Sequence, residues 1–175
     1  MTVIIRHVTF DDIPPIHAIY SNSVLQETAS WELTPPDVAE MGRRMQGVLE
    51  QGYPYFVATL DERVVGYSYA SSYRPRPGYR FTVENSIYVH PAFQRRGIAR
   101  QLMTTVIEAC TARGFRQMIA VIGDSENHAS IALHRSLDFV QVGLLPTIGF
   151  KFGRWLDGVL MQRPLGAGNT TLPAE

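Results

Sequence analysis

Five apolar residues in a row, at positions 118–122, place the strongest limit on how this chain folds. A run this short and wholly apolar predicts a strand buried on both faces, which is typical of a strand with a parallel neighbour and helices on either side. Amphipathic segments flank it at 98–113, where Ile98 and Leu102 share one face, and at 127–137. The sequence therefore predicts an α/β fold with this strand near the centre of its sheet.

Other segments predict the remaining strands and helices. A capping segment at 9–12 precedes a helix with Ile16 and Tyr20 on one side, and we expect Thr34 to cap a second helix that stops at Gly52. Strands are expected at 3–6, 55–60, 64–70, 81–89, 140–145 and 156–162, with loops at 73–80 and 149–155. These segments predict a central, twisted, mixed sheet of about seven strands flanked by about four helices.

The composition indicates one domain. A chain of 175 residues with 45% hydrophobic content can bury one core, which we assign to residues 1–165, and residues 166–175 are expected to form a flexible tail. Lys and Arg together number 16, as do Asp and Glu, so no overall charge attracts nucleic acid or an anionic membrane. A single cysteine and an N-terminus unlike a secretion signal predict a protein of the reducing cytoplasm.

A basic turn at 93–100 lies between the expected strand at 81–89 and the helix that follows it. It contains Arg95, Arg96 and Gly97, and the glycine allows the backbone to come close to a ligand. Two arginines beside the unpaired amides of a helix N-terminus suit a pyrophosphate. The same pattern is typical of a solvated helix cap, so the turn alone does not decide between these interpretations.

Two motifs resemble the signatures of one enzyme superfamily. The run 94–99, Gln-Arg-Arg-Gly-Ile-Ala, resembles the turn Gln/Arg-x-x-Gly-x-Gly/Ala of the GNAT acyltransferases. The segment from Asn127 to Phe139 resembles the second signature of that superfamily. The resemblance implies the GNAT acyltransferase fold, in which the fourth and fifth strands splay apart and the pantetheine arm of acetyl-CoA lies between them.

A closer resemblance covers residues 3–163 and points to the phosphinothricin and methionine sulfoximine or sulfone N-acetyltransferases. It is carried by Trp31 with Thr34-Pro35, Tyr73-Arg74-Pro75, the run 81–89, the run 120–122, Leu133-His134 and the spaced residues of 149–157. This resemblance implies transfer of acetyl from acetyl-CoA to the α-amino group of a small toxic amino acid analogue, in a ternary complex and without a covalent enzyme intermediate. It also implies a homodimer and a role in resistance.

The resemblance assigns cofactor-binding residues by their match to the family motifs. Backbone groups of the strand would bond the pantetheine amides, amides of the basic turn would hold the pyrophosphate, and the helix-start asparagine would bond the cofactor arm. These residues are Ile87, Tyr88, Val89, Arg95, Arg96, Gly97, Ile98, Ala99, Arg100 and Asn127. Asn127 also fits an ordinary helix N-cap, and the two roles are compatible.

Two residues are candidates for proton transfer. An amine arrives mostly as an ammonium at neutral pH, so a base must remove a proton before the nitrogen attacks the thioester. Glu84, which interrupts an apolar and aromatic strand, matches the family position for that base. Where the superfamily usually has a tyrosine that protonates the leaving thiolate, this chain has His134, as does the closer subfamily. It either donates that proton or only bonds a backbone carbonyl, and both interpretations stay open.

Substrate recognition needs groups for an α-carboxylate and for a second anionic or strongly polar group, and arginine suits both. We prefer Arg74 for this role, by its match to the family. Trp31 either walls the pocket or anchors a loop, and Lys151 lies in the expected loop that would reach the partner's pocket. The full set of expected substrate-binding residues is Trp31, Tyr73, Arg74, Pro75, Arg76, Glu84, Asn85, Ser86 and Lys151.

Other classes of function are less well supported. The acidic and histidine residues at 124–134 do not have metal-site spacing, and a P-loop pattern is missing, so we expect neither a metal nor nucleotide hydrolysis. Two alternatives remain: acetylation of another amine or a peptide N-terminus, and a non-catalytic module that binds acyl-CoA. Glu84 beside two cofactor motifs favours catalysis.

Overall fold

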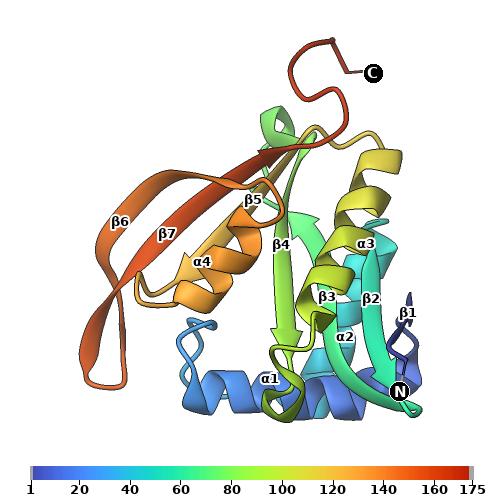
Figure 1. Cartoon of the computed structure of the whole chain (residues 1–175), viewed down its shortest axis with the longest axis vertical. Helices are drawn as coiled ribbons and strands as arrows, with labels where there is room; N and C mark the ends of the chain where they lie inside the picture. Colours follow the sequence, from blue (N-terminus) through green and yellow to red (C-terminus); the bar gives the residue numbers. More distant parts are fainter. Residues whose placement is uncertain (1, 174–175) are drawn as a thin grey trace.

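The computed structural model describes residues 2–173, and these form one mixed sheet with helices on both of its faces (Figure 1). The strands lie in the order β1-β2-β3-β4-β5-β7-β6, and each neighbouring pair is antiparallel except β4 with β5. Their bounds are β1 Ile4–His7, β2 Tyr55–Leu60, β3 Arg63–Ser72, β4 Thr82–Val89, β5 Gln117–Gly123, β6 Val140–Lys151 and β7 Arg154–Pro164. The predicted mixed sheet of seven strands is confirmed.

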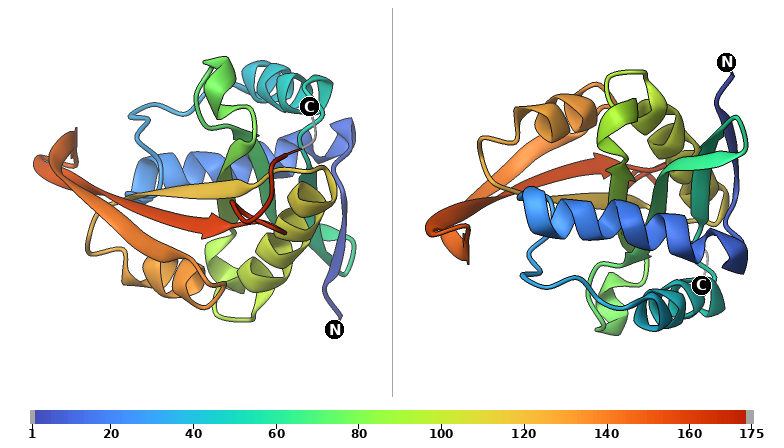
Figure 2. Two further views of the ribbon diagram at one scale, coloured as in Figure 1. Left: turned by 90° about the horizontal axis from the view of Figure 1, so that it is seen from above. Right: turned by 90° about the horizontal axis from the view of Figure 1, so that it is seen from below.

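Four α-helices cover the sheet, two on each face (Figure 2). They are α1 Ile13–Gln26, α2 Val38–Glu50, α3 Ile98–Ala112 and α4 His128–Arg135. Ile16 of α1 and Met45 of α2 pack on the buried tyrosines of β2 and β3, whereas Leu102 and Val106 of α3 pack on the other face. Within residues 2–173, every helix is too short or too polar to cross a membrane.

The parallel pair β4 and β5 separates soon after it begins. Their backbones pair at three positions, Thr82 with Gln117, Val83 with Met118 and Glu84 with Ile119, although β4 continues to Val89. At the next position, the side chain Nδ2 of Asn85 donates to the carbonyl of Ile119 over 3.1 Å. A side-chain amide therefore takes over where the backbone ladder ends, and the predicted splay between the fourth and fifth strands is confirmed (Figure 1).

Two local predictions are wrong. The N-cap of α2 is Asp37, whose Oδ1 accepts from the backbone N–H of Glu40 over 2.7 Å, so the helix starts after the two prolines and Thr34 does not cap it. Residues 149–155 are not a loop, because β6 and β7 continue through them to a two-residue turn. Phe152 and Gly153 both have positive φ, 53° and 73°, which is the geometry of a tight hairpin turn.

Part of the expected flexible tail contacts the sheet. Nη1 of Arg116 donates to the carbonyl of Gly168 and to Oγ1 of Thr171, and Nη2 donates to the carbonyl of Leu172. These hydrogen bonds place residues 168–172 beside the start of β5. Flexibility of the tail stays a prediction, and residues 174 and 175 lie outside the described part of the chain.

Candidate active site

Glu84 lies on β4 at the point where the sheet opens. Side chains alternate along a strand, so Glu84, Ser86 and Tyr88 face α1 and α2, while Asn85 faces α4. A cavity of about 270 Å³ passes through the opening and is lined by all four residues, together with Trp31. Burial raises the pKa of the Glu84 carboxyl. A partly desolvated carboxylate in a small cavity is suited to accept a proton from a bound amine.

His134 lies on the α4 side of the same cavity and is 2% exposed. Its Nε2 lies 3.0 Å from Oδ1 of Asn85, and its Nδ1 lies 2.8 Å from the carbonyl of Ser130 and 3.4 Å from the Ser130 hydroxyl. Burial lowers the pKa of His134, which favours a neutral ring with one N–H. Asn85 donates from Nδ2 to Ile119, so its Oδ1 is an acceptor, as is the Ser130 carbonyl, and a neutral His134 ring donates to only one of these two acceptors at a time.

The contacts of His134 match one of its two expected interpretations. The bond to a backbone carbonyl is present, and the chain His134–Asn85–Ile119 joins α4 to both sides of the splay. Proton donation by His134 to a leaving thiolate stays a prediction.

A larger cavity of about 1110 Å³ adjoins the first one and extends to the basic turn. Its expected cofactor-binding residues are Ile87, Tyr88, Val89, Arg95, Gly97, Ile98, Ala99, Arg100 and Asn127. Gly97 is the N-cap of α3 in the left-handed conformation, with φ 76°, and Arg95 before it has φ 59°. This backbone leaves the first amides of a 15-residue helix free for an anion, with arginine on both sides.

Arg96 differs from the other residues of this turn. It does not line the cavity, and its guanidinium lies 5.3 Å from the centre of the Phe93 ring. Asn127 caps α4, since its Oδ1 accepts from the backbone N–H of Ser130 over 3.2 Å, and it also lines both cavities. Asn127 therefore caps α4 and borders the cavities at the same time, and its bonding to the cofactor arm stays a prediction.

The loop between α1 and α2 forms a wall of the smaller cavity through Ser30, Trp31 and Glu32. Lys151, which is 3% exposed, holds this loop by donating from Nζ to the carbonyls of Glu27 and Ser30, each over 2.8 Å. Burial lowers the pKa of Lys151. Lys151 lines neither cavity, so within this chain it positions the loop.

Trp31 has both of its expected roles in the structure. It lines the smaller cavity, and its indole packs so closely on β6 that a Cβ at Gly149 would lie 1.9 Å from Cζ3 of Trp31. Gly149 is therefore required by the tryptophan, which explains a glycine that looked like a loop signal.

The expected arginine-bearing loop lies away from both cavities. Tyr73, Arg74, Pro75 and Arg76 line neither of them, and Arg74 packs its guanidinium over the rings of Tyr73 and Tyr79 at 5.2 and 5.9 Å. Among the described residues, the charged ones that line the smaller cavity are Glu32 and Glu84. Their substrate contacts stay a prediction.

Sequence reasoning missed several residues of the smaller cavity, notably Tyr20, Ser30 and Glu32. Tyr20 was assigned to the apolar side of a helix, and the loop that carries Ser30 and Glu32 has no periodicity. The one available signal was position, because both loop residues are neighbours of Trp31, which carries the family resemblance.

The profile described as the Acetyltransferase (GNAT) family matches residues 16–139. The chain therefore belongs to the GNAT family of acetyltransferases. It is 52% identical over 169 residues to the phosphinothricin N-acetyltransferase of Alcaligenes faecalis, which covers 97% of this chain and 86% of the relative. It is 42% identical over 163 residues to the L-methionine sulfoximine/L-methionine sulfone acetyltransferase of Pseudomonas paraeruginosa, which covers 93% and 94%.

A solved structure agrees with this assignment. The crystal structure of a GNAT superfamily phosphinothricin acetyltransferase from Sinorhizobium meliloti, in complex with AcCoA, superposes with a TM-score of 0.97 at 48% identity. The superposition covers 100% of this chain and 95% of that one. This chain is an acetyl-CoA-dependent N-acetyltransferase, and its larger cavity, with free amides and arginines at one end, fits that donor.

The two arginines of the turn should differ in their effect on donor binding. Arg95→Glu places a negative charge in the cavity against the pyrophosphate, and we expect the Kd for CoA to rise about tenfold or more. Arg96→Glu reverses the same charge outside the cavity and should weaken binding much less. Calorimetric titration with CoA measures both, with melting temperature as the control for folding. An equal loss of CoA affinity in the two variants would contradict the prediction that Arg95 contributes more than Arg96 to donor binding.

Proposed function

We propose that this enzyme acetylates the α-amino group of a small toxic amino acid analogue: phosphinothricin, methionine sulfoximine or methionine sulfone. The observation that carries the proposal is the half-buried Glu84 carboxylate, which faces a small cavity at the opening of the sheet. The names of relatives at 52% and 42% identity support these three substrates.

In the proposed reaction, Glu84 removes a proton from the substrate ammonium, either directly or through one water. Acetyl-CoA supplies the activated acetyl group as a thioester. The amine nitrogen forms a bond to the acetyl carbon, and the bond from that carbon to sulfur breaks. A backbone N–H near Val89 meets the developing oxyanion, and the nitrogen releases a second proton to water as the intermediate collapses to the amide. The thiolate takes a proton from His134 or from water.

The size of the cavity favours a small substrate over the two alternatives. About 270 Å³ is space for one amino acid, whereas a peptide N-terminus needs an open groove for the chain that follows it. A non-catalytic acyl-CoA-binding module would not need a carboxylate at this place, where partial burial of its charge costs free energy.

We further propose a homodimer formed through the β6–β7 hairpin. This hairpin extends away from the helices in Figure 1, and β6 is an edge strand. It carries large apolar side chains that are between 41% and 66% exposed: Val140, Val142, Leu144, Leu145, Ile148, Phe150, Phe152 and Trp155. Several exposed apolar side chains on one hairpin are typical of an interface, and a second copy presents the same side chains.

The proposed location and biological role follow from the substrates. We place the enzyme in the cytoplasm, where acetyl-CoA is made, and assign it a role in resistance. Acetylation removes the positive charge of the α-amino group, so an analogue that mimics an amino acid loses one of its recognition groups.

A panel of amines tests the proposed function. We expect strong thiol release from acetyl-CoA with at least one of phosphinothricin, methionine sulfoximine and methionine sulfone, and little with glutamate or a short peptide. A thiol-reactive dye measures the release. Preference for the peptide, or no release from any member despite measurable acetyl-CoA binding, would refute the proposal.

Glu84→Gln should lower kcat about 10²- to 10⁴-fold without weakening acetyl-CoA binding, because it removes the proton acceptor and keeps the shape. A base acts in its deprotonated form, and burial raises the pKa of Glu84. Activity of the parent should therefore fall as the pH drops through this raised pKa, at a higher pH than for an exposed glutamate. A steady-state pH profile measures this. An unchanged kcat in the variant would remove Glu84 as the base.

Substitutions on the hairpin test the proposed dimer. Val142→Glu with Leu144→Glu should give a protein with the mass of one chain, because the charges would be buried in the interface. Ile4→Glu is a matched control, since Ile4 is 59% exposed on β1 at the opposite edge of the sheet. Sedimentation measures the mass, and a single-chain mass for the parent would contradict the dimer.

A further inference from the structure

We propose that Arg44 is a specificity residue of the substrate site, because it pairs with Glu32 and brings a positive charge to a cavity whose charged lining is acidic. Arg44 would thereby permit substrates that carry a second anionic group. This inference rests on the proposed function, since it concerns which of the amino acid analogues the same cavity accepts.

The acidic lining of the smaller cavity would repel a substrate that carries two negative groups. Glu32 and Glu84 both line it, and among the lining residues in the described part of the chain none is lysine or arginine. Phosphinothricin has an α-carboxylate and a phosphinate, so two negative groups would enter a space that already holds two carboxylates. Like charges a few ångströms apart in a partly desolvated site repel one another strongly.

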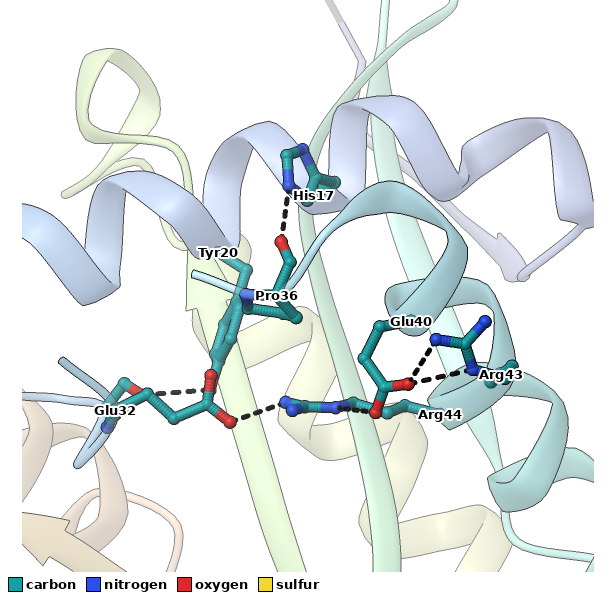
Figure 3. Close-up of polar contacts among 8 residues, drawn as sticks. His17, Tyr20, Glu32, Pro36, Glu40, Arg43 and Arg44 are labelled. Atoms are coloured by element: carbon teal, nitrogen blue, oxygen red, sulfur yellow. Dashed lines mark hydrogen bonds and ion pairs between the residues drawn. The ribbon is translucent and has the colours of Figure 1, made fainter. Parts of the chain in front are cut away.

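Arg44 reaches this site from α2. Its Nη1 donates to Oε1 of Glu32 over 2.6 Å, and its Nε donates to Oε1 of Glu40 over 3.0 Å. Figure 3 shows the guanidinium between the two carboxylates, with Glu32 close to Tyr20. Glu40 is also held by the exposed Arg43, so Arg44 is the arginine that links the helix to the cavity wall.

Tyrosines connect Arg44 to the interior of the site. A third cavity, of about 50 Å³, is lined by Arg44, Tyr20 and Tyr69. Tyr20 also lines the cavity of about 270 Å³ that contains Glu84. The hydroxyl of Tyr20 lies 2.9 Å from Oγ of Ser30, another wall residue. Burial raises the pKa of Tyr69, and the charge of Glu84 adds to this shift while Arg44 opposes it. Arg44 and Glu84 thus act on the same tyrosine.

The ion pair between Arg44 and Glu32 is expected to contribute little to the stability of the fold. The side chains of Arg44 and Glu32 are 44% and 34% exposed, and ion pairs at this exposure contribute little to folding. On α2 itself, Glu40 already gives Arg44 an i,i+4 partner. The additional contact with Glu32 has its main consequence for the charge that a bound substrate meets.

Arg44→Gln tests the inference, with KM measured for two substrates that differ by one negative charge. We expect KM for phosphinothricin to rise about tenfold or more, while KM for methionine sulfone, which lacks the phosphinate, rises much less. Arg43→Gln is the matched control, because Arg43 is 66% exposed and contacts Glu40 without reaching the cavity wall. It should leave both KM values unchanged.

The double variant Glu32→Gln with Arg44→Gln separates charge from structure. It removes the carboxylate that Arg44 neutralises, so KM for phosphinothricin should return toward that of the parent. An equal rise in KM for both substrates in Arg44→Gln, or no recovery in the double variant, would overturn the inference. A parent enzyme that acetylates neither substrate would instead refute the proposed function, so the two failures are distinguishable.

Discussion

The opening between β4 and β5 is the constraint on which the rest of the molecule depends. Two parallel strands that pair at three positions and then separate leave backbone groups of β4 free for a ligand. The opening also lets one cavity pass through the sheet, so Glu84 on one face and His134 on the other border the same space. Asn85 and His134 hold its edges, since their hydrogen bonds join β4, β5 and α4.

One wall of the smaller cavity is an irregular loop that contacts from three elements hold in place. Lys151 of β6 holds its backbone, Tyr20 of α1 contacts Ser30, and Arg44 of α2 pairs with Glu32. Each of these contacts uses a polar group to fix a segment that has no regular hydrogen bonding of its own. The loop is thus positioned by its two flanking helices and by Lys151, which is more than 100 positions away in the sequence.

The basic turn gives the larger cavity a positive end, whereas Glu27, Asp124 and Glu126 line other parts of it. Arginines and helix amides line one end of the larger cavity, whereas carboxylates are the charged groups of the smaller one. This contrast suits a reaction that joins an anionic donor to an amine, because each end attracts the group of opposite charge. The acidic lining is also the basis of our proposal that Arg44 balances the charge of Glu32 when the amine carries further negative groups.

The sequence by itself determined the order of elements, the mixed sheet and the basic turn, because hydrophobic periodicity, helix caps and a glycine at the turn act over a few residues. It also identified Glu84, Asn127 and His134 through local motifs. It misjudged residues 149–155, where Gly149 is a strand residue packed against Trp31 and Gly153 belongs to the hairpin turn. Only the tertiary structure decided that Glu32 and Tyr20 line the cavity and that Lys151 holds its wall. The contacts of Lys151 join residues more than 100 positions apart, and long-range packing leaves no periodic signal in a sequence.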